Sequence, residues 1–210
     1  MSPKISASTI AEQRAMRQEQ IIQTALSMAI EGGAKSVTMS AVAREAGISR
    51  SALYEYFSSS ADLISDLILD ELNNCHSRLA SATSRSNIPL EQVSIWIEES
   101  LAYVADGRHM LAKSLNSIAP PEFRREEIRT AHIALMSTLK NPLDALGIPM
   151  GFPAIPLLQS AIDVATKRIE SGKDAKLEIQ IAKAFVLAGL EAIADRTRPV
   201  RLKREESPRI

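Results

Sequence analysis

The sequence predicts an all-α protein, and two observations carry this prediction. Long stretches contain neither Gly nor Pro, among them residues 4–31, 48–88 and 122–141. A strand-rich protein of this size needs turn residues about every 8–12 positions, so such gaps favour helices. Apolar residues also recur at helical spacing, and no stretch alternates between apolar and polar side chains as a half-buried strand would.

The helices are predicted from the N-terminus onward by caps and breakers. Thr9 and Glu12 have the spacing of a capping box, and the pair Gly32-Gly33 ends the helix that follows. The segments 119–121 and 141–156 are rich in Pro and are expected to be loops, with Pro121 in the first turn of the next helix. Two long apolar helices then follow, at about 154–171 and 174–195.

Composition describes an ordinary folded chain. The 210 residues are 45% hydrophobic and 24% charged, and 25 Lys and Arg balance 25 Asp and Glu. No apolar run approaches the roughly 20 residues that cross a bilayer, and residues 1–10 lack the layout of a secretory signal. Cys75 is the single cysteine, which excludes a disulfide framework. We therefore expect a cytoplasmic protein without membrane contact.

Charge is distributed unevenly along the chain. Residues 1–60 have six basic and five acidic side chains, residues 61–195 have thirteen and eighteen, and residues 196–210 have six and two. A middle region that is more acidic than both ends indicates two domains and a tail. We place the domains at residues 1–58 and 59–195. The basic tail, 196–210, is expected to be disordered, with a second contact to DNA or another polyanion as the alternative.

Residues 37–57 predict two short helices joined by a turn. Thr38 is a good N-cap for the first helix, Gly47 supplies a turn with positive φ, and Ser49 caps the second helix. The small side chain of Ala43 allows the two helices to cross closely. Together these features predict a helix-turn-helix, the alternative being a capped helical hairpin in an unrelated bundle.

The second helix of this motif fits the major groove of DNA, which is about 12 Å wide. Arg50 is suited to bidentate contact with guanine, Ser51 to a base or a phosphate, and Tyr54 to a phosphate or a thymine methyl group. Hydroxyls and free N–H groups at the start of the first helix are suited to phosphate. The candidate DNA-binding residues are Thr38, Ser40, Arg44, Ser49, Arg50, Ser51, Tyr54 and Tyr56.

A series of short motifs in this region forms a specific pattern. It consists of Ile21-Ile22-x-x-Ala25-Leu26, Gly32-Gly33, Val37-Thr38-Met39, Val42-Ala43-x-x-Ala46-Gly47-Ile48-Ser49 and Leu53-Tyr54-x-Tyr56-Phe57. The pattern resembles the DNA-binding domain of the TetR family of bacterial transcriptional regulators. The resemblance implies a homodimer that binds a palindromic operator on double-stranded DNA, more often as a repressor than as an activator. It also implies a C-terminal domain that binds a small-molecule effector and pairs through its last two long helices, here 154–171 and 174–195. The alternative for these helices is a buried pair within one chain.

One position departs from the family pattern. Relatives commonly have Lys in a Phe-x-x-Lys-x-x-Leu arrangement, where this chain has Ser60 between Phe57 and Leu63. Because Ser60 has no charge, phosphate neutralisation falls to Arg44, Arg50, Lys4, Arg14 and Arg17, and we expect modest non-specific affinity for DNA. The run of Ser residues from 58 to 60 can still cap the next helix, whose N–H groups can meet a phosphate.

Large or polar side chains on otherwise apolar helices are the candidates for an effector pocket. They are Trp96, Tyr103, His109, Met110, Phe123, His132, Met136 and Phe152. The alternative is that they only pack, and that the C-terminal domain serves protein contacts without a ligand. The three His are dispersed, and the motifs HExxH and GxSxG are absent from the sequence. We therefore predict no enzymatic activity, no metal and no cofactor.

Overall fold

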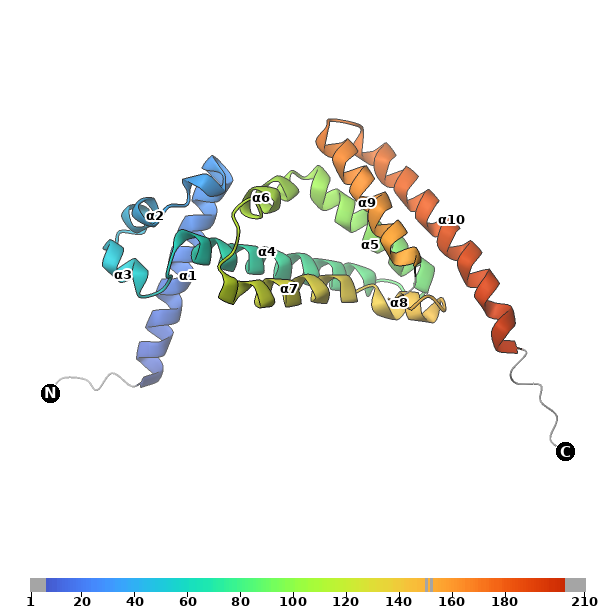
Figure 1. The fold of residues 1–210 in the computed structure, drawn as a ribbon, viewed down its shortest axis with the longest axis horizontal. Helices are drawn as coiled ribbons and strands as arrows, with labels where there is room; N and C mark the ends of the chain where they lie inside the picture. Colours follow the sequence, from blue (N-terminus) through green and yellow to red (C-terminus); the bar gives the residue numbers. More distant parts are fainter. Residues whose placement is uncertain (1–6, 150, 152, 203–210) are drawn as a thin grey trace. The chain divides into compact units, whose positions relative to one another are not determined.

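The computed structural model describes residues 7–149, 151 and 153–202, and these residues form helices without any strand (Figure 1). The all-α prediction is confirmed. The first helices are α1 (Ala7–Gly32), the 3-10 helix η1 (Ala34–Ser36), α2 (Met39–Glu45) and α3 (Arg50–Tyr54). They are followed by α4 (Ser60–Thr83), α5 (Pro89–Ala105), α6 (Arg108–Leu115), α7 (Glu122–Ser137), α8 (Lys140–Ala145), α9 (Ala154–Glu170) and α10 (Ala175–Leu202).

Packing divides the chain into two compact units. The first consists of Met1–Leu72 with Met110–Ala131, and the second of Asn73–His109 with His132–Ile210. These units group residues by contact and do not say which residues bind DNA. The boundary between the DNA-binding and ligand-binding domains at residue 58 therefore stays a prediction.

The first unit has an apolar core beneath α1, α2 and α3. Its fully buried members include Ile21, Ala25, Val42, Leu53 and Phe57. Two residues from the later segment, Leu115 and Ile128, belong to the same core. The hydroxyl of Ser114 also accepts a hydrogen bond from the Ala34 N–H at 2.8 Å. The segment 110–131 is thus an integral part of the unit that contains the helix-turn-helix.

In the second unit, α5 packs against α8, α9 and α10. The core includes Trp96, Ile97, Leu101, Leu143 and Leu158. The indole Nε1 of Trp96 donates a hydrogen bond to Thr138 Oγ1 at 2.8 Å, which satisfies the polar atom of this buried ring. The Glu99 carboxylate is paired with both Arg78 and Arg85, which lie at 3.1 and 2.7 Å.

Three expected boundaries differ from the structure. Helix α1 begins at Ala7, so Thr9 lies inside the helix and does not cap it. The expected loop 141–156 contains α8 and the first turn of α9. Its prolines 142 and 156 stand in first turns, where a missing N–H removes no helical hydrogen bond. Helix α7 begins at Glu122, directly after Pro121 and not with it.

Helix α10 extends to Leu202, into the segment expected to be a disordered tail, and the disorder of residues 196–210 stays a prediction. Residues 203–210 of the predicted tail lie outside the described residues.

Candidate nucleic-acid interface and apolar groove

Helices α2 and α3 begin at side-chain caps. The Thr38 hydroxyl accepts a hydrogen bond from the Ala41 N–H at 3.3 Å, and the Ser49 hydroxyl accepts one from the Ala52 N–H at 3.1 Å. Between the helices, Gly47 has φ 67°, a conformation that favours Gly because a Cβ would be strained there. The two caps and the turn glycine confirm the local structure that the sequence predicts.

The inner faces of α2 and α3 are buried. Val42 and Leu53 are fully shielded from solvent, and Ala43 is 2% exposed. The Ala43 carbonyl accepts a hydrogen bond from the Ile48 N–H at 2.9 Å, which brings the turn back onto α2. With one face of each short helix buried, its other face is fixed toward solvent.

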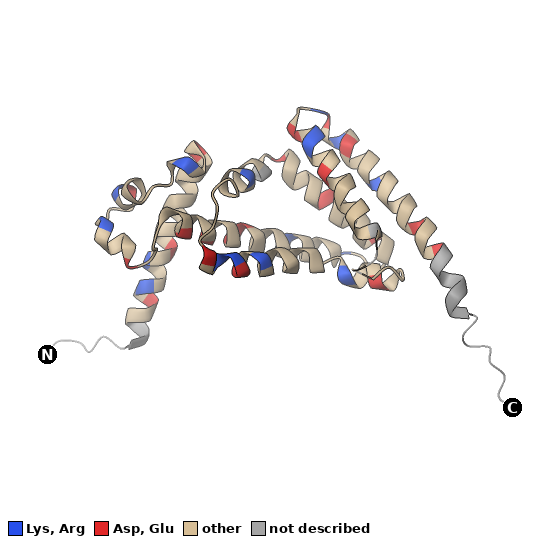
Figure 2. Cartoon of the chain, viewed as in Figure 1, with Lys and Arg blue, Asp and Glu red and all other residues tan. Residues whose placement is uncertain are grey.

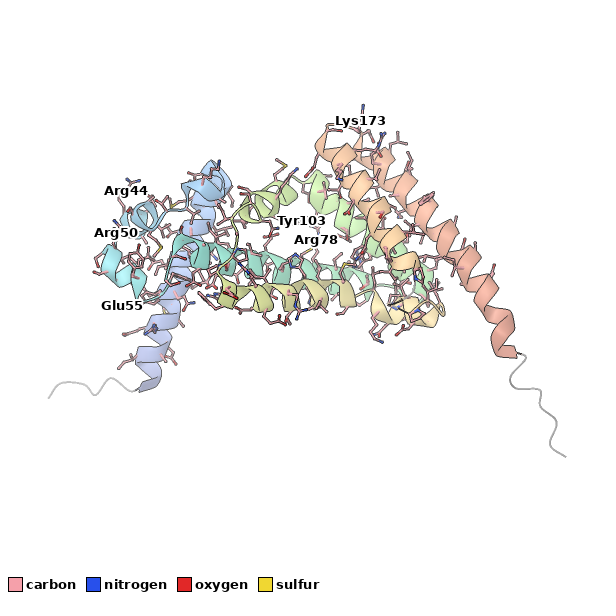
Figure 3. All side chains as sticks on the ribbon, viewed as in Figure 1. Arg44, Arg50, Glu55, Arg78, Tyr103 and Lys173 are labelled. Carbon is pink, nitrogen blue, oxygen red and sulfur yellow. The ribbon has the colours of Figure 1, made fainter. Side chains whose placement is uncertain are left out.

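The exposed side of this motif carries most of the candidate DNA-binding residues. The exposed candidates are Thr38, Ser40, Arg44, Ser49, Arg50, Ser51 and Tyr54. Figure 3 places Arg44 and Arg50 at the outer edge of the α2–α3 pair. The hydroxyls of Ser49 and Ser51 lie 2.9 Å apart, so the first turn of α3 presents two linked hydroxyls beside the Arg50 guanidinium.

Tyr56 differs from the other candidates. It is half-buried and packs against the core of the first unit, and the Arg14 guanidinium lies 5.3 Å from the centre of its ring. Arg14 also donates a hydrogen bond to the Glu55 carbonyl at 3.1 Å. Both contacts hold the end of α3 against α1. From its sequence position Arg14 is expected to neutralise phosphate, and no local motif signals its contacts with Glu55 and Tyr56.

Charge near α3 is mixed. Figure 2 shows basic residues on α2 and at the start of α3, and acidic residues at the end of α2 and just after α3. Glu45 and Glu55 are both exposed. The net positive charge that would attract phosphate is therefore small, which agrees with the departure at Ser60.

The start of α4 is capped by its own side chains. The Ser59 hydroxyl accepts a hydrogen bond from the Asp62 N–H at 3.1 Å, and Asp62 Oδ2 accepts from the Ser58 N–H and the Ser58 hydroxyl, each at 2.9 Å. A carboxylate at this position interacts favourably with the positive end of the helix. The N–H groups of Ser58 and Asp62 are thus already bonded within the chain, which leaves fewer donors for a phosphate than the run of Ser residues suggests.

The cap at Thr38 gives a direct test of the local structure. Thr38→Ala is expected to lower the free energy of unfolding by about 1 kcal/mol, because the Ala41 N–H loses its side-chain acceptor. The measurement is denaturant unfolding monitored by circular dichroism. Ser27→Ala on α1 is the control: its hydroxyl only bonds back to the Gln23 carbonyl, and Ala is the better helix former. Equal stability of the Thr38 variant and the natural protein would contradict the cap.

An open apolar groove of ≈ 890 Å³ runs between α9 and α10 in the second unit. Its lining includes Leu157, Val164, Ile181, Phe185, Ala188 and Gly189. Phe185 is 69% exposed and Leu157 is 67% exposed, although side chains of this size are normally buried. Figure 2 shows that uncharged residues predominate along these two helices. A contiguous apolar surface of this kind marks an interaction site.

None of the candidate pocket residues that the structure describes lines this groove. Trp96 is buried, Tyr103 and Met136 are half-buried, and Met110, Phe123 and His132 are exposed. The side chain of His109 and all of Phe152 lie outside the described residues. Met110 and Phe123 belong to the first unit and the others to the second. The assignment of these residues to one pocket stays a prediction.

The described residues lack two further classes of site. No cluster of three or more His, Cys, Asp or Glu side chains there is arranged to hold a metal ion. No described helix combines the length and apolar character that crossing a membrane requires.

Comparison with known proteins identifies the helix-turn-helix. Residues 21–67 match the sequence pattern of the bacterial regulatory proteins of the tetR family. The HTH-type transcriptional regulator BetI of Agrobacterium fabrum is 25% identical over 197 residues, which cover 79% of this chain and 95% of that protein.

Solved structures share the fold. The fatty acid degradation regulator FadR of Bacillus halodurans superimposes with a TM-score of 0.60 at 17% identity, covering 83% of this chain and 96% of that one. A TetR/AcrR-family regulator of Thermobifida fusca gives 0.60 at 20% identity, with 82% and 97% covered. FadR of Bacillus subtilis, solved in complex with stearoyl-CoA, gives 0.57 at 18% identity, with 82% and 96% covered. The matched pattern over residues 21–67, the relative and the shared fold agree with the geometry of α2 and α3, and together they support a DNA-binding transcriptional regulator of the TetR family.

Proposed function

We propose that the protein is a homodimeric repressor that binds a palindromic operator and is released by a small-molecule effector. The observation that carries this proposal is the exposed face of α3, which stands on a buried core and begins at a side-chain cap. As a regulator it acts in the cytoplasm, where the bacterial genome lies, and it needs no catalytic activity.

Base recognition is assigned to the first turns of α3. The Arg50 guanidinium provides the paired donors that match the O6 and N7 atoms of guanine. Ser51 and Tyr54 lie on the same exposed side, where a hydroxyl and an aromatic ring can contact a base edge or the phosphate backbone. Phosphate contacts that set the position of α3 are assigned to Thr38, the N-cap of α2, and to Ser40 and Arg44 on α2.

The dimer is assigned to the groove between α9 and α10. A second copy fits this surface because two identical apolar helix pairs can pack as a four-helix interface with two-fold symmetry. Ala161, Ala188 and Gly189 give the groove shallow positions, while Leu157 and Phe185 give it projecting ones. Projections of one copy can therefore enter the shallow positions of the other. The two-fold symmetry would present two α3 helices to the two halves of a palindrome.

Effector binding is assigned to the helical C-terminal domain. Its chemical class is open to a direct test, and stearoyl-CoA, which FadR of Bacillus subtilis holds in its solved structure, is a reasonable first ligand. A C-terminal domain that serves only protein contacts is the alternative. Release of bound DNA by a small molecule in purified components would exclude that alternative.

Fluorescence anisotropy with the DNA flanking the protein's own gene tests DNA recognition. We expect saturable sub-micromolar binding, with preference over random DNA. Arg50→Ala and Tyr54→Ala are each expected to lower the specific affinity at least tenfold, since a good base contact is worth about 1–3 kcal/mol. Arg129→Ala is the control, because Arg129 is an exposed α7 residue paired with Glu126. Absence of DNA binding under all conditions would contradict the proposed function.

The same titration at several salt concentrations tests the small positive charge of the α2–α3 surface. Each neutralised phosphate contributes about 0.9 to the slope of log affinity against log salt. We expect a slope that corresponds to fewer than about ten released counterions per dimer. A steeper slope would mean that cations other than those of α1, α2 and α3 reach the DNA.

A further inference from the structure

Arg124, at the start of α7, lies in a cluster of carboxylates within the first unit. Its Nε donates to Asp62 Oδ1 at 2.8 Å, its Nη2 pairs with Asp66 Oδ1 at 2.8 Å, and its Nη1 with Glu127 Oε2 at 2.9 Å. Every guanidinium nitrogen therefore has a carboxylate partner. The Asp62 and Asp66 side chains are 7% and 13% exposed, so solvent screens these two pairs only weakly.

Asp62 connects Arg124 to the turn that follows the recognition helix α3. One carboxylate oxygen, Oδ1, is bound by Arg124, and the other, Oδ2, by the N–H and the hydroxyl of Ser58. Ser58 lies only four positions after Tyr54, the last residue of α3. A single carboxylate thus joins α7, the start of α4 and the end of the recognition element.

The same cluster reaches α1. The Gln18 Nε2 donates to Asp66 Oδ2 at 3.5 Å, and nearby on α1 Arg14 holds the Glu55 carbonyl and the Tyr56 ring. Two arginines from different segments thus fix the carboxyl end of α3, Arg14 directly and Arg124 through Asp62.

The titration behaviour of the two aspartates agrees with this arrangement. Burial disfavours the ionised form of Asp62, but hydrogen bonds from Ser58 and Arg124 outweigh burial and hold the pKa of Asp62 below its ordinary value. For Asp66, burial dominates and raises the pKa, although the charge of Arg124 opposes it. Without Arg124, both carboxylates would lose the cation that compensates their burial.

We propose that Arg124 is a positioning residue for operator recognition: it holds Asp62, and Asp62 fixes the Ser58 turn and with it the orientation of α3. Arg124 does this without touching DNA itself. The proposal rests on the proposed function, because it assigns to α3 the reading of an operator. The segment 110–131, which contains Arg124, also shares a core with the helix-turn-helix.

The test compares Arg124→Met with Arg129→Met, a matched loss of an exposed α7 arginine, in the full chain. Operator and random DNA are titrated across a salt series, at a temperature where circular dichroism shows each variant folded. We expect Arg124→Met to lower operator affinity at least tenfold and affinity for random DNA less than threefold. The salt slope should not change, because no phosphate contact is lost. Arg129→Met should leave both affinities within twofold.

Two further variants separate positioning from stability. The double variant Arg124→Met/Asp66→Asn also lacks the Asp66 carboxylate, which the loss of Arg124 alone leaves without its cation. It should regain stability without regaining operator affinity. Arg124→Lys keeps the charge but lacks the planar fork, and is expected to restore only part of the affinity. Hydrogen exchange of a peptide covering residues 55–62 should be faster in Arg124→Met, because the acceptor of the Ser58 N–H is no longer held.

The outcomes are distinguishable. Natural protein that binds no DNA contradicts the proposed function. If the natural protein binds its operator and Arg124→Met binds it equally well, only the positioning role is overturned. A salt slope reduced by about one per protomer would instead make Arg124 a direct phosphate contact and would also overturn the proposal. Recovery of operator affinity together with stability in the double variant would reduce Arg124 to a structural role.

Discussion

Replacing Phe185 with glutamate is expected to convert the proposed dimer into a monomer and to lower operator affinity at least hundredfold. Phe185 lies in the middle of α10 and lines the apolar groove. In a two-fold interface one substitution introduces two carboxylates among apolar side chains, and the Arg168 that lines the groove is already paired with Glu178. Removing an unpaired charge from water costs several kcal/mol, which exceeds what the lost apolar contact contributes.

The loss of operator affinity follows from the loss of the dimer. In a dimer, binding of one recognition helix holds the other near its half-site at a high effective concentration, and a monomer lacks this advantage. Sedimentation velocity gives the oligomeric state, and anisotropy gives the affinity. Leu177→Glu is the control, since Leu177 is an exposed apolar residue on the same helix but does not line the groove. If the Phe185→Glu protein remained dimeric, the dimer interface would have to lie on another surface.

Phe57→Ala is expected to lower the free energy of unfolding by about 3–5 kcal/mol. Phe57 is 1% exposed and is the largest fully buried side chain, in the core beneath α2 and α3. Removing the ring leaves a cavity between the end of α3 and the start of α4. The backbone cannot easily move to fill this cavity, because the Phe57 N–H donates a hydrogen bond to the Leu53 carbonyl at 3.1 Å. Because small domains are stable by only about 5–15 kcal/mol, the helix-turn-helix should lose order near physiological temperature.

Denaturant unfolding and operator titration measure the two effects of this substitution. Phe123→Ala is the matched control, as Phe123 is 66% exposed on α7 and its loss should cost little. Operator binding by Phe57→Ala should recover on cooling if the defect is stability alone. A change in the free energy of unfolding below about 1 kcal/mol would show that the core can collapse around the missing ring.

The helix-turn-helix could be predicted from sequence because its determinants are local. Thr38, Gly47 and Ser49 act within three or four residues of their own positions, through caps and a turn conformation. The end of α9 and the start of α10 could be predicted in the same way, since Gly172, which has positive φ, lies between two long apolar runs. Local rules failed at Pro142, where a proline that suggested a loop stands inside the first turn of α8.

Contacts between distant segments could not be predicted in the same way. The pairing of Arg124 with Asp62 joins residues 62 positions apart, and nothing in the local sequence of either residue signals the other. The exposure of Phe185 is also a tertiary property, because periodicity shows that a helix is apolar on several sides but not which side its own chain covers. The same limit applies to the predicted pocket residues: Phe123 and Trp96 both interrupt apolar helices in the sequence, yet Phe123 is exposed and Trp96 is buried.

The self-capped start of α4 has a consequence for how the regulator finds its target. A bacterial chromosome offers about 10⁶ or more competing sites, which sequester most copies of a strongly cationic regulator. Here an aspartate is bound to the turn after the recognition helix, and Ser60 replaces the usual cation. Arbitrary sequence should therefore hold the protein only briefly. Fewer copies per cell would then suffice to occupy the operator, and a gene under the control of the proposed repressor would respond quickly once the protein dissociates.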